Sequence, residues 1–411
     1  MKPPPTSFPK NNMNVLLLGG IHASARATFH AHGYTNIELE SHEYSEEELI
    51  KIIGNIHILG IRSATHVTPR VLEHAKKLLT IGCFCIGTNQ VAIRDAKLKG
   101  VPVFNAPFSN TRSVAELVIA EVVLLLRDIP AKNAAAHCGE WRKSARGSFE
   151  ARGKTLGIVG YGHIGTQVGI LAEALGMRVL YYDIEAKLSL GNAQAVHSLT
   201  ELLKTADVVT LHVPGGENTR HLIGTEELQC MHKGAALINA SRGHVVNMDA
   251  LIAALKSGHL AGAAIDVYPQ EPGSTGNTFS SPLQTFENVL LTPHIAGSTS
   301  EAQERIGREV AEKLVRYSDT GSTAGAVNFL DVSLPPHVGK HRILHIHRNQ
   351  PGVLAAVNEI FAREKVNIAG QFLQTDADLG YVVTDVDQRR GIELLSRLKA
   401  IPGTIRTRIL Y

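Results

Sequence analysis

The stretch TLGIVGYGHIGTQ, from Thr155 to Gln167, decides the fold predicted for this chain. It places Gly160, Gly162 and Gly165 in the spacing G-x-G-x-x-G, directly after an apolar run and directly before a helical pattern. In that context the glycines allow a tight turn and a close approach of the backbone to a ligand, and the pyrophosphate of a dinucleotide can lie on the amides that begin the helix. A glycine-rich turn without a nucleotide is the plainer alternative, and the flanking patterns count against it.

An acidic residue follows the next apolar run. Asp183 ends RVLYYD, 23 residues after Gly160. A carboxylate at this position accepts hydrogen bonds from the ribose hydroxyls and repels a 2′-phosphate, so NAD is predicted rather than NADP. His163 and Ile164, between the glycines, are predicted to lie near the pyrophosphate.

Strand and helix patterns continue on both sides of this motif. Continuous Val/Ile/Leu-rich runs predict six strands of a doubly wound parallel sheet, at residues 155–160, 178–183, 207–214, 235–241, 262–268 and 288–294. Similar short runs between Asn14 and Pro107 predict a smaller α/β domain, and residues 341–411 follow the ferredoxin-like order βαββαβ. The prediction is an α/β protein with two Rossmann-like doubly wound parallel-sheet domains and a C-terminal ferredoxin-like domain.

The composition is that of a globular protein. The 411 residues suggest roughly two to three domains. A formal charge of +3 and the lack of long Lys/Arg runs give no indication of a nucleic-acid or membrane partner. The most apolar helical pattern, Ser113–Leu126, contains Glu116 and Glu121 and is shorter than the ~20 residues of a membrane span. It predicts a buried helix that Asn110 could cap.

Neither the N-terminus nor the cysteines add a further function. Residues 1–13 are predicted to be a disordered arm without a signal peptide or lipidation motif. Cys83, Cys85, Cys138 and Cys230 lack zinc-ligand spacing, so no metal site is predicted, and small buried side chains in a reducing cytoplasm explain them.

Three chemically active side chains follow neighbouring strands of the larger predicted sheet. Arg242 follows AALINAS, Glu271 lies beyond GAAIDVY with Asp266 at the strand end, and His294 ends NVLLTPH. Because the carboxyl ends of parallel strands share one edge, these side chains are expected to meet there. An arginine can hold a carboxylate bidentately, and a glutamate can orient a histidine base and raise its pKa. Taken singly, each could equally be a surface or loop residue.

With these residues identified, the chain resembles the D-isomer-specific 2-hydroxyacid dehydrogenases from Asn14 to Tyr411. Within that family it resembles the branch that carries a C-terminal ACT domain and acts on 3-phospho-D-glycerate. The motifs that carry the likeness include VPVFNAPFSNTRSVAEL, LINASRG, AGAAIDVYPQEP, LLTPHIAGST and HIHRNQPGVL. The resemblance implies that Arg242, Glu271 and His294 are catalytic. It implies NAD contacts from Gly160, Gly162, His163, Ile164, Gly165, Asp183, Ala240, Ser241, Arg242, Asp266, His294, Ile295, Ala296 and Gly297.

The resemblance also implies the domain boundaries. These are a substrate-binding domain of residues 14–107 and 298–333, an NAD-binding domain of residues 108–297, a linker of residues 334–340 and an ACT regulatory domain of residues 341–411.

Substrate and effector residues are implied in the same way. The phosphorylated substrate would be bound by Arg62, Ser63, Asn110, Lys143 and Arg242, and L-serine would bind as effector at His347, Asn349 and Asn367. Solvated surface charges remain the alternative for Arg62 and Lys143, and polar strand-end residues remain the alternative for the effector set. Ala64 stands where relatives often have a second arginine, which implies one phosphate contact fewer.

The predicted function is NAD-dependent oxidation of 3-phospho-D-glycerate to 3-phosphooxypyruvate, the first step of L-serine biosynthesis. Feedback inhibition by L-serine, a side activity that reduces 2-oxoglutarate, a homotetramer and a cytoplasmic location are implied with it. The alternatives are another D-2-hydroxyacid dehydrogenase and a non-enzymatic protein that senses NAD.

Overall fold

The computed structural model describes residues 8–272, 278–335, 337, 341–387 and 392–410. The chain divides into two compact units, one formed by Met1–Ser109 with Gln303–Tyr411 and the other by Asn110–Ala302. Residues 1–7 of the predicted arm and residues 336 and 338–340 of the predicted linker lie outside the described residues.

The unit Asn110–Ala302 contains a seven-stranded sheet. Its strands are β6 (Thr155–Val159), β7 (Arg178–Tyr182), β8 (Gln194–Ala195), β9 (Val208–Leu211), β10 (Ala236–Asn239), β11 (Gly262–Ile265) and β12 (Val289–Leu291). The order is β12-β11-β10-β9-β6-β7-β8 and every pairing is parallel. The six predicted strands are confirmed, and the two-residue β8 was missed because it is too short to form an apolar run. The strand order reverses between β6 and β9, where sheets of this kind bind dinucleotides.

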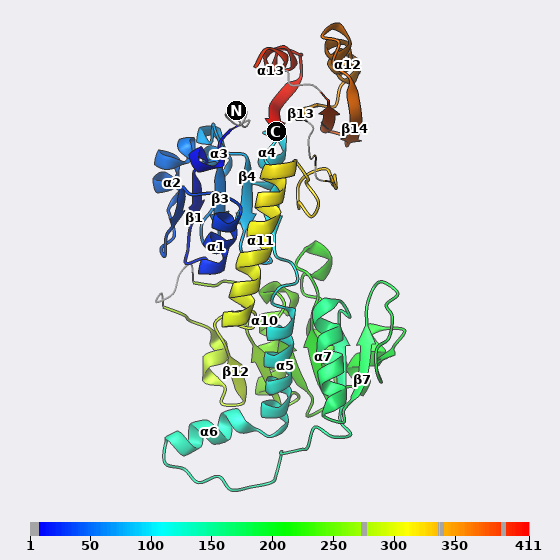
Figure 1. Ribbon diagram of the computed structural model, residues 1–411. Coiled ribbons are helices and arrows are strands. Elements are labelled where there is room, and N and C mark those ends of the chain that lie inside the picture. Colours follow the sequence, from blue (N-terminus) through cyan, green and yellow to red (C-terminus); the bar gives the residue numbers. More distant parts are fainter. Residues whose placement is uncertain (1–7, 273–277, 336, 338–340, 388–391, 411) are drawn as a thin grey trace. The chain divides into compact units, whose positions relative to one another are not determined.

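Helices cover both faces of this sheet. Helices α5 (Thr111–Leu126) and α7 (His163–Ala174) lie side by side and share one apolar core with it (Figure 1). The second core holds buried residues of α8 (Leu199–Thr205), α9 (Thr225–Cys230) and α10 (Met248–Lys256) on the opposite face. A shorter helix, α6 (Ile129–His137), follows α5 in the chain. The prediction of a doubly wound sheet with a buried helix at 113–126 is thus confirmed.

Helix α5 runs antiparallel to the strands. A Cβ added to Gly262, which begins β11, would lie 3.3 Å from Leu125 near the end of α5. A Cβ added to Gly297, beyond the end of β12, would lie 2.2 Å from the Asn110 amide nitrogen. Asn110 is the residue before α5 but makes no side-chain capping hydrogen bond, so the predicted cap is wrong. Its amide instead packs closely against Gly297.

The other unit contains a five-stranded parallel sheet. Its strands are β1 (Val15–Leu17), β2 (Ile37–Leu39), β3 (Ile58–Ile61), β4 (Thr80–Cys83) and β5 (Val103–Asn105), in the order β2-β1-β3-β4-β5. One core packs against α1 (Ala23–Ala31) and α11 (Ser300–Thr320), and the other against α2 (Glu46–Ile52), α3 (Pro69–His74) and α4 (Ile93–Leu98). The edge strand β2 is only half-buried, so it gave no continuous apolar run.

The end of the predicted disordered arm is ordered. Lys10–Asn12 form a short 3-10 helix, the Lys10 ammonium lies 2.6 Å from an Asp319 carboxylate oxygen, and Met13 is buried. The prediction of disorder is therefore wrong for these residues, because composition did not reveal this ion pair or the burial of Met13.

The same unit ends in a four-stranded antiparallel sheet. Its elements are β13 (His341–Arg348), α12 (Val353–Arg363), β14 (Ile368–Thr375), β15 (Leu379–Val386), α13 (Ile392–Lys399) and β16 (Thr404–Leu410). The strand order is β14-β15-β13-β16. The two helices pack on one face, and the other face packs on Phe329, Leu330 and Val332. The predicted ferredoxin-like order is confirmed. Within the described ranges, no helix is both long enough and apolar enough to cross a membrane.

Candidate active site

The turn after β6 fits a bound dinucleotide. Gly160 has φ 91°, a left-handed conformation that favours glycine, and a Cβ there would lie 2.5 Å from the His212 carbonyl oxygen. A Cβ on Gly165 would lie 2.2 Å from the Gly160 carbonyl oxygen, so this glycine lets α7 pack closely. Gly162 precedes the first residue of α7, and a Cβ there would meet no atom within 4 Å. That open space beside the amides of the helix start suits a pyrophosphate.

Asp183 follows β7 as predicted. Its Oδ2 accepts a hydrogen bond of 2.8 Å from the Tyr161 amide and its Oδ1 accepts one of 3.0 Å from the Glu185 amide. These bonds fix the carboxylate beside the turn of Gly160. His163 is the first residue of α7, and the half-buried Ile164 packs on the core beneath it. The residues therefore fit an NAD whose ribose meets a carboxylate.

Arg242 lies beyond the end of β10 in a turn that Asn239 holds. The Asn239 side chain accepts from the Ser241 amide and hydroxyl and donates to the Arg242 carbonyl oxygen at 3.0 Å. A Cβ on Gly243 would lie 2.0 Å from the Tyr268 carbonyl carbon, so only glycine allows this turn to approach the segment after β11. The Arg242 guanidinium donates to the Ser241 carbonyl oxygen at 2.7 Å, which leaves further N–H groups for an anion.

Glu271 and His294 form a direct hydrogen bond. The distance from His294 Nδ1 to Glu271 Oε2 is 2.8 Å, and Glu271 Oε1 accepts from the Tyr268 amide at 3.0 Å. An ionised carboxylate can only accept, so Nδ1 carries the hydrogen and Nε2 is the nitrogen that can take a proton. The His294 side chain is about half exposed, at 52%.

The hydrogen bond shifts both pKa values in the directions expected of an acid–base pair. The bond to Glu271 raises the pKa of His294, against burial, which lowers it. Burial acts to raise the pKa of Glu271, but the hydrogen bonds from His294 and the Tyr268 amide, with the nearby Arg242 charge, lower it overall. Arg242 acts electrostatically on both partners, so the three side chains share one site.

Asp266 holds the backbone that presents His294. Its buried carboxylate accepts from the Thr292 hydroxyl at 2.6 Å, the Ile295 amide at 2.8 Å and the Ala296 amide at 3.0 Å. His294 itself has φ 55°, an uncommon conformation for a residue other than glycine. Three hydrogen bonds on both sides of the histidine maintain this strained backbone.

Tyr268 and Thr292 are site residues that the sequence prediction missed. The Tyr268 amide binds Glu271, its hydroxyl lies 3.0 Å from the Thr292 carbonyl oxygen, and the Thr292 side chain binds Asp266. Their positions at the ends of β11 and β12 were the signal that could have found them.

Arg62 and Ser63 belong to the other unit, where they follow β3. The order β2-β1-β3-β4-β5 reverses direction between β1 and β3, and ligands bind at such a point. The Arg62 guanidinium lies 3.4 Å from the carbonyl oxygen of Gly19, which follows β1. Both residues therefore lie at the ligand-binding edge of their own sheet. Lys143 lies exposed in the segment after α6.

Two of the three predicted effector residues lie at one end of the C-terminal sheet. His347 is buried near the end of β13. Asn349 follows β13, and its side chain donates to the Asp376 carbonyl oxygen at 2.6 Å. Asn367 precedes β14 and donates to Asp387 at 2.8 Å.

Asn367 lies at the opposite end of that sheet. Ile368, the residue after it, pairs with Val386, which also pairs with His341 at the start of β13. Asn349 lies eight residues after His341 along this strand, which is roughly 25 Å at ~3.3 Å per residue. One chain therefore does not bring Asn367 together with the other two.

Glu121 is a buried carboxyl group on α5. It is 2% exposed, and neither of its oxygens has a hydrogen-bond partner among the described residues. Burial, with a smaller effect of Asp266, raises the pKa of Glu121 from 4.5 to about 8. Glu116 on the same helix is exposed and pairs with Arg112.

Glu121→Gln is expected to make the NAD-binding domain more stable at neutral pH. Between about pH 4.5 and pH 8 the folded state retains a proton that the unfolded state has released, so this group lowers the unfolding free energy as pH rises. The slope is about 1.4 kcal/mol per pH unit. Urea unfolding should show the advantage of the variant growing by about 2 to 3 kcal/mol from about pH 5.5 to about pH 7.5. Glu116→Gln, the control, should show no such growth, and a constant difference for Glu121→Gln would contradict the assignment.

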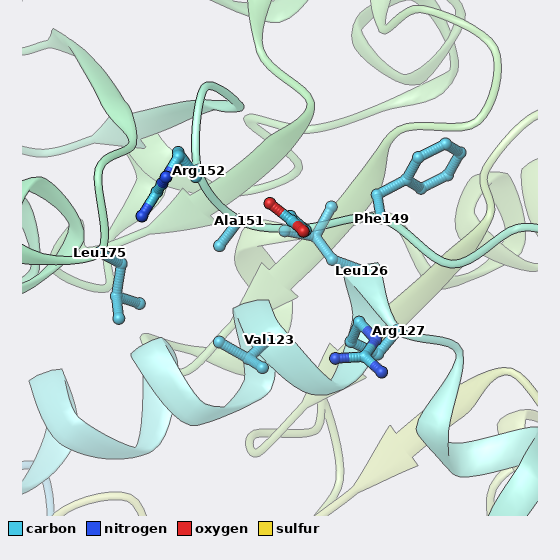
Figure 2. Close-up of a pocket in the computed structure, with 8 residues that line it drawn as sticks. Val123, Leu126, Arg127, Phe149, Ala151, Arg152 and Leu175 are labelled. Carbon is cyan, nitrogen blue, oxygen red and sulfur yellow. The ribbon is translucent and has the colours of Figure 1, made fainter. Parts of the chain in front are cut away.

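A pocket of about 450 Å³ lies elsewhere on the same unit. In Figure 2, Arg127 and Arg152 lie on either side of the apolar side chains of Leu126 and Ala151. The pocket is at the C-terminal end of α5, whereas Gly297 and the loop of His294 lie toward its N-terminal end. It is therefore not part of the dinucleotide edge. Among the described residues, no group of His, Cys, Asp or Glu is arranged to hold a metal ion.

Comparisons with known proteins agree with this geometry. A family model described as the NAD binding domain of D-isomer specific 2-hydroxyacid dehydrogenases matches residues 119–296, and an AHAS small subunit-like ACT domain matches residues 343–406. The predictions of NAD as cofactor and of a C-terminal ACT domain are confirmed.

Relatives match over the whole chain. D-3-phosphoglycerate dehydrogenase of Escherichia coli (strain K12) is 58% identical over 407 residues, which cover 98% of this chain and 99% of that protein. The enzyme of the same name from Dictyostelium discoideum is 48% identical over 408 residues, covering 99% and 100%. The solved D-lactate dehydrogenase from Aquifex aeolicus, complexed with NAD and lactic acid, is 28% identical with a TM-score of 0.64, covering 74% of this chain and 95% of that one. The chain therefore belongs to the D-isomer-specific 2-hydroxyacid dehydrogenases, in the D-3-phosphoglycerate dehydrogenase branch.

Proposed function

We propose that this protein oxidises 3-phospho-D-glycerate to 3-phosphooxypyruvate with NAD, the first step of L-serine biosynthesis. The observation that carries the reaction type is the 2.8 Å hydrogen bond between His294 and Glu271 at the edge of an NAD-binding sheet. The choice of substrate is supported by the 58% identity over nearly the whole chain to a D-3-phosphoglycerate dehydrogenase.

Each catalytic side chain has a separate task in the proposed mechanism. NAD, when bound, supplies the acceptor for the hydride that leaves C2 of the substrate. His294 takes the hydroxyl proton on Nε2, because Nδ1–H is committed to Glu271. Glu271 keeps the ring in this tautomer and stabilises the imidazolium that forms. Arg242 binds the carboxylate and polarises the adjacent oxygen at C2.

The remaining NAD contacts are proposed on the same edge. Gly160, Gly162, Gly165, His163 and Ile164 would surround the pyrophosphate and Asp183 the ribose. The turn Ala240–Arg242, Asp266 and the backbone of residues 294–297 would surround the nicotinamide.

The phosphate and the domain arrangement are also proposals. Arg62 and Ser63 would bind the substrate from the switch point of the five-stranded sheet, with charge from Lys143 and a polar contact from Asn110. The substrate-binding domain would comprise residues 14–107 and 298–333, the NAD-binding domain residues 108–297, the linker residues 334–340 and the ACT domain residues 341–411. The contact boundaries after Ser109 and Ala302 lie close to these limits.

We propose further that L-serine binds between two ACT domains of a homotetramer. The separation of Asn367 from His347 and Asn349 supports a site completed by a second copy, since a small amino acid cannot span roughly 25 Å. The edge strand β14 is unpaired on its outer side within the described sheet and exposes Leu373. A second pairing, through the NAD-binding domains, would cover Trp141, which is 87% exposed after α6. The four free cysteines support a cytoplasmic location.

The test is steady-state kinetics with a panel of acids. The full chain should oxidise 3-phospho-D-glycerate with NAD at a kcat/KM at least about a hundredfold above that for D-lactate, because Arg62 and Lys143 favour a phosphate. Reduction of 2-oxoglutarate should be slower than reduction of 3-phosphooxypyruvate, and L-serine should inhibit. Equal use of unphosphorylated acids would contradict the substrate, and a lack of any serine effect would contradict the effector.

Glu271→Gln is expected to lower kcat for oxidation by about tenfold to a hundredfold and to change its pH dependence. The oxidation needs neutral His294, so the rate rises with pH through the histidine pKa. Glu271 raises that pKa, and its removal should move the acidic limb of the profile to lower pH. Profiles of kcat/KM should show the shift. An unmoved acidic limb would mean that Glu271 does not act through His294.

A further inference from the structure

Glu121 and Asp266 lie on the two sides of one helix–sheet interface. Side chains of a strand alternate between faces, so Gly262, Ala264 and Asp266 point to the same face. Ala264 belongs to the core shared with α5, whereas Ala263 and Ile265 belong to the opposite core. Asp266 therefore points toward α5.

The antiparallel course of α5 brings Glu121 close to the end of β11. Leu125 lies against Gly262, and one helical turn earlier is Glu121, about 6 Å further along the axis at ~1.5 Å per residue. Two strand residues cover about the same length, from Gly262 to Ala264. Glu121 thus lies level with Ala264, and its side chain is close enough to Asp266 for that carboxylate to act on it electrostatically.

The surroundings of Glu121 leave it without a stabilising partner. Asp266 acts on it electrostatically. Burial raises the pKa of the Tyr268 hydroxyl, and the charges of Asp266 and, to a smaller extent, Glu121 raise it further. The apolar side chains that share this core with α5 include residues of β10, β12 and α7. They include Ile238, Leu290, Ile164 and Val168. No cation among the described residues compensates a charge on Glu121, and its two oxygens accept no hydrogen bond there.

Asp266, in contrast, accepts hydrogen bonds through both of its carboxylate oxygens. Its three hydrogen bonds come from Thr292 and from the amides of Ile295 and Ala296, the residues that flank His294. An ionised carboxylate offers only acceptor sites, which suits three donors. A second negative charge beneath it would oppose this state, because like charges in a buried site repel strongly.

We propose that Glu121 is a positioning residue for this site. While Glu121 is protonated, Asp266 is the single carboxylate beneath the loop of His294. Ionisation of Glu121 weakens the hydrogen bonds from that loop to Asp266 and therefore weakens NADH binding. The inference rests on the proposed NAD contacts of Asp266 and residues 294–297. It goes beyond them because Glu121 touches neither substrate nor cofactor.

The test is titration of the full chain with NADH, followed by fluorescence, from about pH 6.5 to about pH 9.5. For the wild type the Kd should rise about tenfold across the range in which Glu121 ionises, near pH 8. Glu121→Gln should bind NADH at about pH 6.5 within about twofold of the wild type and should lose this alkaline rise. Glu116→Gln, on the exposed face of the same helix, should keep it.

Two results would overturn the proposal. One is an alkaline rise in Kd that persists in Glu121→Gln, and the other is a wild type whose Kd does not change with pH. Glu121→Met, which also removes the charge, provides the same readout if the glutamine variant folds poorly. Because NADH binding does not need substrate, failure to oxidise 3-phospho-D-glycerate would contradict the proposed function and would leave this test intact.

Discussion

Replacing His294 with glutamine is expected to lower kcat for oxidation by about two to four orders of magnitude. The variant loses the nitrogen that accepts the hydroxyl proton, while a glutamine amide can still donate to Glu271. The backbone around position 294 is held by Asp266 through its neighbours, so the loop should remain in place. Stopped-flow or steady-state NADH formation measures the loss.

The controls separate chemistry from binding. The Kd for NADH should stay within about threefold of the wild type, since the cofactor contacts proposed for the loop of His294 come from its backbone and from Asp266. His197→Gln, at an exposed position in the same unit, should have normal activity. A His294→Gln enzyme with near-normal kcat would remove the histidine from its proposed role.

Arg242→Lys is expected to lower kcat/KM by about 10² to 10³, which corresponds to about 3 to 4 kcal/mol of transition-state stabilisation. Lysine keeps the charge but cannot present two parallel N–H groups to a carboxylate. Arg242→Ala should lose at least as much. The effect should appear in both kcat and KM, because the carboxylate is held in the ground state and the adjacent oxygen is polarised in the transition state.

The matched control for this position is Arg220→Ala, an exposed arginine of the same unit, which should leave the kinetics unchanged. NADH affinity should change less than kcat/KM in the Arg242 variants, because the backbone of the turn at residues 240–242 remains. A full retention of kcat/KM in Arg242→Lys would show that a point charge suffices, and would contradict bidentate recognition.

The architecture was readable from the sequence because buried parallel strands appear as continuous apolar runs. The runs of β6, β9 and β10 are fully buried and were easily recognised, whereas β2 at a half-exposed edge and the two-residue β8 gave no such signal. The order of Lys10 and Met13 depends on contacts with residues more than three hundred positions away, which composition does not encode.

The sequence predicts the residue types of the site, but it does not predict the backbone conformation and hydrogen bonds that hold them. The positions of Arg242, Glu271 and His294 after neighbouring strands predict that they meet, because the carboxyl ends of parallel strands share an edge. The left-handed backbone conformation of His294 and the three hydrogen bonds that Asp266 accepts depend on tertiary packing. In the sequence, Glu121 only interrupts an apolar helical pattern. Its burial depends on how α5 packs against the sheet, which the pattern does not show.

The separation within the ACT domain illustrates the same limit. The family resemblance implies three effector residues, yet the strand register places Asn367 and Asn349 at opposite ends of the sheet. Only the pairing of β13, β14 and β15 reveals that a shared ligand would need two chains.

The most direct test of the central claim is formation of NADH from NAD and 3-phospho-D-glycerate by the full chain, followed at 340 nm with the 3-phosphooxypyruvate trapped by hydrazine. We expect NADH formation that is proportional to the amount of enzyme, absent with the L enantiomer and lost in His294→Gln. A folded protein that binds NADH but forms none from 3-phospho-D-glycerate would contradict it.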